Sequence, residues 1–229
     1  MAGFDLIIFD CDGVLVDSEI IAAQVESKLL SDAGYPITAE ELAERFAGLT
    51  WKDILFEVER EASIPFSATL LDASETLLDK KLGREVRAID GATQAIARIT
   101  GPRCICSNSS AHRLKAMLAR TGLDRLFGER VYSAKDLGEG RTKPAPDVFL
   151  HAAEQFDVKP ANVLVVEDSE HGIHAAVAAG MRVVGFTGGS HSYPGHADKL
   201  TEAGAETVIN RMAELPATVE ALAGWSELL

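Results

Sequence analysis

The strongest constraint on the fold is a set of short apolar runs, each followed by polar residues. Along the 229 residues these runs lie at 4–9, 104–106, 163–166 and 183–186. Runs so short and continuous are typical of parallel strands that are buried on both faces. The segments between them have helical patterns around residues 109–120, 146–156 and 170–179. Strands that alternate with helices predict an α/β fold with a doubly wound parallel sheet.

Residues 18–87 interrupt this alternation. They contain helical patterns without strand-like runs, at 20–33, 39–46, 51–61 and 70–87. A helical block inserted after the first strand predicts a small separate domain. We therefore expect an α/β core over residues 1–17 and 88–229, and a helical domain over residues 18–87.

Composition excludes several classes of partner. The chain has 22 basic and 35 acidic side chains, a formal net charge of −13, which disfavours binding to nucleic acid or anionic membranes. Its apolar runs are far shorter than the roughly 20 residues that span a bilayer. The amino terminus lacks the positive region of a signal peptide, and three cysteines are too few for a disulfide framework. We expect a cytoplasmic protein, a monomer or weak homodimer, whose partner is a small molecule.

Polar residues follow the first two runs where a doubly wound sheet binds its ligand, at the carboxyl ends of its strands. Asp10 and Asp12 follow the first run and flank a turn at Gly13, so that the two carboxylates can perform different tasks. A surface turn is the alternative for such a motif taken alone. Ser107 and Asn108 follow the second run, where hydroxyls and amides bind phosphoryl oxygens or cap a helix.

Two later segments add a cation and two carboxylates. Lys143 precedes two prolines, which fix the backbone and favour a helix start; a lone lysine is otherwise usually solvated. Glu167 and Asp168 follow the third apolar run. Placed beside Asp10 and Asp12, they would form an acidic cluster whose repulsion requires a hard cation, most simply Mg²⁺.

These four motifs, in this order, resemble those of the haloacid dehalogenase-like (HAD) hydrolase superfamily. The resemblance covers essentially the whole chain. It implies a Rossmann-like core and identifies residues 18–87 as the α-helical cap. Residues 15–19 and 143–147 are most similar to the β-phosphoglucomutase-like and phosphosugar phosphatase branch.

The resemblance also implies roles for the motif residues. Asp10 would attack phosphorus to form an aspartyl-phosphate, and Asp12 would protonate the leaving alkoxide and then activate water. Lys143 would neutralise phosphoryl charge, while Ser107 and Asn108 would contact the phosphoryl group.

For the metal, the implied ligands of Mg²⁺ are the Asp10 carboxylate, the backbone carbonyl of Asp12, and Asp168. Glu167 would bind either directly or through water.

Departures from the family pattern favour hydrolysis over a mutase reaction. Mutases of this branch have a histidine early in the first cap helix, whereas residues 20–24 contain none. The expected function is a Mg²⁺-dependent phosphatase for a small phosphate monoester, such as 6-phosphogluconate, with a phosphosugar mutase as the alternative. A phosphonoacetaldehyde hydrolase would use a cap lysine, here Lys52, but lacks the second aspartate. A catalytically idle binding protein would be expected to have lost Asp10 or Lys143.

The cap is expected to set substrate specificity, because the core motifs contact only the phosphoryl group. Candidate contacts are Glu19, Thr50, Trp51 and Lys52, the last two in the cap loop where mutases carry a basic residue. Packing in the cap core is the alternative for Trp51, and a solvated position is the alternative for Glu19 and Lys52. A Gly-rich stretch at 188–192 either closes on the site or forms a mobile connection.

Overall fold

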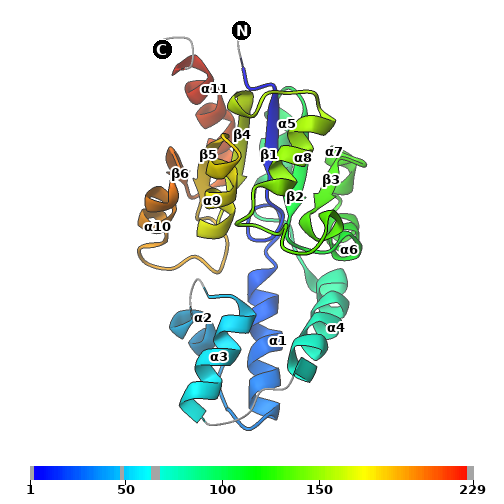
Figure 1. Cartoon of the computed structure of the whole chain (residues 1–229), viewed down its shortest axis with the longest axis vertical. Helices are drawn as coiled ribbons and strands as arrows, with labels where there is room; N and C mark the ends of the chain where they lie inside the picture. Colours follow the sequence, from blue (N-terminus) through cyan, green and yellow to red (C-terminus); the bar gives the residue numbers. More distant parts are fainter. Residues whose placement is uncertain (1–2, 47–48, 63–67, 226–229) are drawn as a thin grey trace.

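The computed structural model describes residues 3–46, 49–62 and 68–225. A six-stranded sheet in the order β3-β2-β1-β4-β5-β6 forms the centre of the larger part (Figure 1). All neighbouring strands are parallel. The strands are β1 Leu6–Phe9, β2 Arg103–Ser107, β3 Val131–Ser133, β4 Val163–Glu167, β5 Arg182–Phe186 and β6 Thr207–Ile209. The order reverses between β1 and β4, which is where such sheets bind ligands.

Helices cover both faces of the sheet. Side chains of each strand alternate between the two faces, and both sets are apolar and buried. In β1, Ile7 and Phe9 join one apolar cluster, and Leu6 and Ile8 join another. On the first face lie α5 Ala92–Arg98, α6 Ala111–Thr121, α7 Asp124–Phe127 and α11 Leu215–Trp225. On the second lie α8 Asp147–Gln155, α9 Glu170–Ala178 and α10 His196–Ala203. The predicted doubly wound α/β core is confirmed.

Short 3₁₀ segments complete the core: η1 Ala134–Leu137, η2 Pro160–Asn162 and η3 Met212–Glu214. Among the helices of the described residues, none is long and apolar enough to cross a lipid bilayer.

Four helices form a separate group beyond the carboxyl ends of the strands (Figure 1). They are α1 Glu19–Asp32, α2 Ala39–Arg45, α3 Trp51–Ala62 and α4 Ala68–Glu85. Buried Leu30, Leu42, Phe46 and Val58 belong to a small apolar core of their own. The start of α2 is fixed by a capping box, in which Thr38 and Glu41 exchange side-chain and backbone hydrogen bonds of 3.1 and 2.9 Å. The predicted helical cap is confirmed.

The chain leaves the core and returns to it along one pair of backbone segments. Val16 pairs with Ala88 in an antiparallel bridge, and the Asp17 amide donates to the Arg87 carbonyl at 2.9 Å. We propose domain boundaries at this pair, with the cap over residues 18–87 and the core over 1–17 and 88–229. Residues 1–2, 47–48, 63–67 and 226–229 of these ranges lie outside the described residues.

Substitution of Phe127, whose ring is fully buried, tests how much packing on the first face contributes to stability. The ring packs edge-on against Phe9, with ring centroids 5.8 Å apart. We expect Phe127→Ala to lower the free energy of unfolding by about 3–5 kcal/mol, because it leaves a cavity. Urea denaturation measures the change. The control is Phe56→Ala, at a ring that is 58% exposed, which should shift stability by about 0.5 kcal/mol or less. Similar losses for both variants would contradict this account of the core.

Candidate active site

Lys143 lies at the centre of the polar residues at the strand ends. Its Nζ donates to Asp10 Oδ1 at 2.5 Å, to Glu167 Oε1 at 2.7 Å and to the Cys106 carbonyl at 2.7 Å. Only 3% of its side chain is exposed. Burial opposes the charged form, but the two carboxylates outweigh it and raise the pKa of Lys143. The lysine is therefore a fixed positive charge between β1 and β4.

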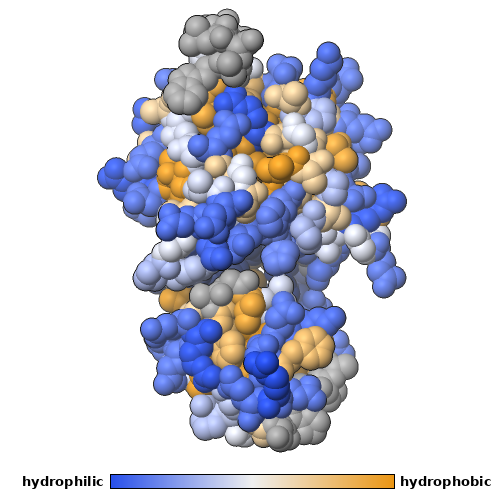
Figure 2. Space-filling model, turned by 60° about the vertical axis from the view of Figure 1, so that its left-hand side comes forward, coloured by the Kyte–Doolittle hydropathy of each residue, from blue (hydrophilic) through white to orange (hydrophobic). Residues whose placement is uncertain are grey.

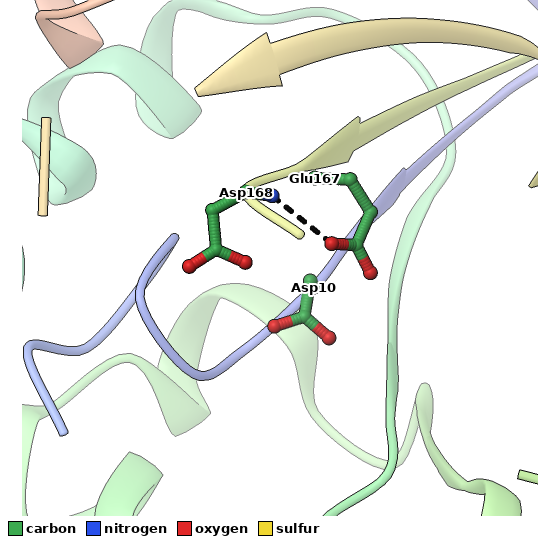
Figure 3. Close-up of side chains that lie close together, drawn as sticks. All are labelled: Asp10, Glu167 and Asp168. Carbon is green, nitrogen blue, oxygen red and sulfur yellow. Dashed lines mark hydrogen bonds between the residues drawn. The ribbon is translucent and has the colours of Figure 1, made fainter. Parts of the chain in front are cut away.

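Three carboxylates converge beside this lysine. Asp10, Glu167 and Asp168 each offer an oxygen, and these atoms all lie within 4.8 Å of one another (Figure 3). Burial raises the pKa of Asp10 well above its ordinary value, although Lys143 acts in the opposite direction. Additional positive charge would favour ionised Asp10. A buried set of carboxylate oxygens fits a hard cation such as Mg²⁺.

The carboxylate oxygens of this cluster differ in whether they accept hydrogen bonds. Glu167 Oε1 is engaged by Lys143, and Glu167 Oε2 accepts bonds from the Asp168 amide and from the amide and hydroxyl of Ser169 at 3.0–3.1 Å. Asp10 Oδ2 and Asp168 Oδ1 accept no hydrogen bond from the described residues. These two oxygens could hold a cation directly, whereas Glu167 orients Lys143.

Asp12 lies apart from this carboxylate cluster. Its Oδ1 accepts a hydrogen bond from Ser18 at 2.9 Å, and its Oδ2 accepts from Ser107 at 3.1 Å and Ser109 at 2.8 Å. The hydroxyls fix the carboxylate in one orientation, so its backbone carbonyl is what remains for the expected metal contact. Ser109 was not among the predicted site residues, because a serine before a helix reads equally as a cap.

Asn108 anchors the backbone of Lys143. Its Oδ1 accepts from the Lys143 amide at 2.8 Å, and its Nδ2 donates to the Lys143 carbonyl at 3.2 Å. The peptide between Lys143 and Pro144 is cis. The amide of Asn108 is therefore occupied by the protein, although the residue also lines the cavity described below.

The Gly-rich stretch closes on the site. His191 Nε2 lies 3.0 Å from Asp168 Oδ2, and the ring of His196 reaches the Asp168 carbonyl at 2.8 Å. Burial opposes a charge on His191, but Asp168 outweighs it and raises the pKa of His191 to about 8. A Cβ at Gly13, where φ is +75°, would lie 1.8 Å from Asp168 Oδ2. Only glycine therefore fits this turn, which follows β1 and lies against Asp168 and the loop at 188–192.

Comparison with known proteins identifies the family. Residues 4–180 match the haloacid dehalogenase-like hydrolase family. The chain belongs to this family. The hydrolase is 29% identical to the 6-phosphogluconate phosphatase of Escherichia coli over 85% of this chain and 87% of that protein. The expected superfamily is thus confirmed, and this relative is itself a phosphosugar phosphatase.

Two solved structures of the same family are similar throughout. A conserved haloacid dehalogenase-like protein of unknown function from Agrobacterium tumefaciens is 68% identical, with a TM-score of 0.90 over 96% of this chain and 100% of that one. A HAD family hydrolase from Deinococcus radiodurans, with bound phosphate and sodium, is 36% identical, with a TM-score of 0.81 over 98% of each chain.

In this hydrolase a cavity of about 720 Å³ lies between core and cap. Its floor contains Asp10, Asp12, Ser107 and Lys143, together with Glu167 and Asp168. Figure 2 shows a largely hydrophilic core surface just above the narrow junction with the cap, and a hydrophobic patch on the cap just below it. The cavity wall is therefore built from both domains.

The predicted cap contacts divide into two groups. Glu19 and Thr50 line the cavity, and Thr50 also donates to Asp53 at 2.6 Å at the start of α3. Trp51 does not line it and instead packs against the cap core. Lys52 is exposed, with its ammonium 5.8 Å from the centre of the Phe56 ring. Gly48, which belongs to the same predicted loop, lies outside the described residues.

Gly172, in the first turn of α9, tests the arrangement around Glu167. A Cβ at this position would lie 1.8 Å from Glu167 Oε1. We expect Gly172→Ala to lower the free energy of unfolding by about 1–3 kcal/mol and to slow hydrolysis of p-nitrophenyl phosphate, since Glu167 would be displaced from Lys143.

The matched control is Gly83→Ala in α4, where the nearest atom to a new Cβ is Ala116 Cβ at 3.8 Å. This variant should be as stable as the unmodified protein or more so, by about 0.5–1 kcal/mol. Unchanged stability and activity in Gly172→Ala would show that Glu167 is not held as described.

Proposed function

We propose that this protein is a Mg²⁺-dependent phosphatase that hydrolyses a small sugar phosphate, such as 6-phosphogluconate, through an aspartyl-phosphate. The observation that carries the proposal is the pairing of Asp10 Oδ1 with buried Lys143, which leaves Asp10 Oδ2 without a hydrogen bond from the described residues. The names of the E. coli relative and of the phosphate-bound neighbour support a phosphoric monoester hydrolase.

The proposed reaction has two displacements at phosphorus. One carboxylate oxygen of Asp10 forms a bond to phosphorus as the ester P–O bond breaks, and Asp12 gives its proton to the departing alkoxide oxygen. Asp12 then takes a proton from water, whose oxygen attacks phosphorus and releases inorganic phosphate from Asp10. Ser18, Ser107 and Ser109 keep Asp12 oriented for both proton transfers.

Two fixed positive charges would assist these steps. Lys143 is held against Asp10 and stabilises negative charge that develops on the phosphoryl oxygens. Asp10, Asp168 and the Asp12 carbonyl are the groups that would hold Mg²⁺, which when bound supplies further positive charge at the phosphoryl group.

A mutase is the weaker alternative because it must also hold a second phosphate. Among the described residues, the cap contributes no lysine or arginine to the cavity wall. Arg113 of α6 lines the cavity, but its Nε is paired with Asp79 at 2.5 Å. Lys52, the lysine that a phosphonoacetaldehyde hydrolase would need, is exposed and does not line the cavity.

Metal removal and loss of the nucleophile test the proposal together. We expect release of p-nitrophenol from p-nitrophenyl phosphate with Mg²⁺, loss of release with excess chelator, and recovery when Mg²⁺ is restored. Asp10→Asn should have no detectable turnover, because the amide cannot attack phosphorus. Asp198→Asn, at an exposed position on α10, is the control and should retain full rate. Metal-independent release, or full activity in Asp10→Asn, would refute the proposed mechanism. No release with Mg²⁺ at all would favour an idle binding protein.

Ser107 tests the support of Asp12. We expect Ser107→Ala to reduce kcat by about 10²-fold, since it removes a hydroxyl that donates to Asp12 and faces the cavity. Steady-state kinetics with p-nitrophenyl phosphate measure the effect. Ser27→Ala removes a hydroxyl whose one hydrogen bond among the described residues goes to the Gln24 carbonyl within α1, and it should leave kcat unchanged. Equal rates for the two variants would exclude a role for Ser107.

A further inference from the structure

The cap wall of the cavity contains a carboxyl group that the proposed reaction does not use. Glu26 lies on α1, seven residues after Glu19, and both residues line the cavity. Two turns of helix separate them by roughly 10 Å. Glu19 is close enough to the floor of the cavity to interact electrostatically with Asp12 and Asp168. Glu26 interacts electrostatically with Glu19 but not with these floor residues. Glu26 therefore marks the end of the cavity farther from the phosphoryl site.

Glu26 has no partner within the described part of the chain. No hydrogen bond or ion pair reaches its carboxyl group there, and neighbouring parts of the cap wall are apolar, including Leu42, Phe46 and Ile54. Burial, and then the charge of Glu19, raise the pKa of Glu26 to about 8. A polar group of this kind that faces a cavity gains its hydrogen bonds from whatever fills the cavity.

The charges around this end of the cavity disfavour an anion. The cap's charged residues in the wall are Glu19 and Glu26, within the described residues. Arg113 faces the cavity with its charge already compensated by Asp79. His171 and His174 of α9 also line the cavity but are exposed residues of the core. A second negative charge brought by a substrate would meet an environment that already disfavours ionised Glu26.

We propose that Glu26 is a specificity-determining residue that forms hydrogen bonds with hydroxyl groups at the far end of an uncharged sugar or polyol leaving group. The inference rests on the proposed function, and it narrows the substrate class by the length and the charge of the leaving group. We expect a short ester such as glycerol 1-phosphate to end before it reaches Glu26. 6-Phosphogluconate has the length of a hexose chain but ends in a carboxylate. It should therefore be a poorer substrate than glucitol 6-phosphate, whose chain ends in an uncharged hydroxyl group.

These three esters form the test, since glucitol 6-phosphate and 6-phosphogluconate differ only at the terminal carbon. The unmodified protein with Mg²⁺ should have a kcat/KM about tenfold higher for glucitol 6-phosphate than for 6-phosphogluconate. Glu26→Ala should lower kcat/KM for glucitol 6-phosphate about tenfold, mainly through KM, and leave glycerol 1-phosphate unchanged. Glu26→Gln, which still bonds to hydroxyls, should retain part of this activity. Glu44→Ala, at an exposed position of α2 outside the cavity, is the control.

Several results would overturn the inference while leaving the phosphatase in place. Among them are an equal loss for the long and short esters in Glu26→Ala, no change for either, and a preference of the unmodified protein for 6-phosphogluconate. Hydrolysis of p-nitrophenyl phosphate without cleavage of glucitol 6-phosphate would overturn it as well. Failure to hydrolyse any of these esters with Mg²⁺ would instead refute the proposed function on which it rests.

Discussion

The active site depends on one buried cation, Lys143, held between carboxylates from two neighbouring strands. Asp10 follows β1 and Glu167 ends β4, so the lysine joins the two sides of the point where the strand order reverses. Its backbone is fixed by Asn108, from the end of β2. Loss of the lysine would leave two carboxylates buried without their partner, which typically costs several kcal/mol. The same contacts that position the proposed nucleophile, Asp10, therefore also tie together the centre of the sheet.

Much of this arrangement could be predicted from sequence, because buried parallel strands form uninterrupted apolar runs and their following residues meet at one edge. The runs at β1, β2, β4 and β5 were found in this way. β3 and β6 were not, since each has three residues and only one of those is fully buried. Ser109 and His191 reach the site through tertiary contacts that no local pattern encodes. For Trp51, spacing alone could not separate cap packing from a substrate contact.

Core and cap differ in how completely their polar groups are satisfied. In the core, Asp12 and Glu167 are surrounded by hydroxyl, amide and ammonium donors. Such dense bonding fixes the orientation of these side chains before a ligand arrives. In the cap wall, Glu19 and Glu26 have no such donors among the described residues. We therefore expect the protein's own donors to orient Asp12 and Glu167, and the substrate to supply hydrogen-bond partners at the far end of the cavity. This division lets a conserved reaction be combined with different leaving groups.

The three serines around Asp12 come from both sides of the domain boundary. Ser107 and Ser109 belong to the core, but Ser18 is the first residue of the proposed cap and directly precedes α1. Its neighbour Asp17 is fixed to the loop that covers Asp168, through Ser190 at 2.5 Å. Asp12 therefore takes its orientation from hydroxyl groups on both sides of the boundary, so the position of the cap bears directly on a carboxylate of the core.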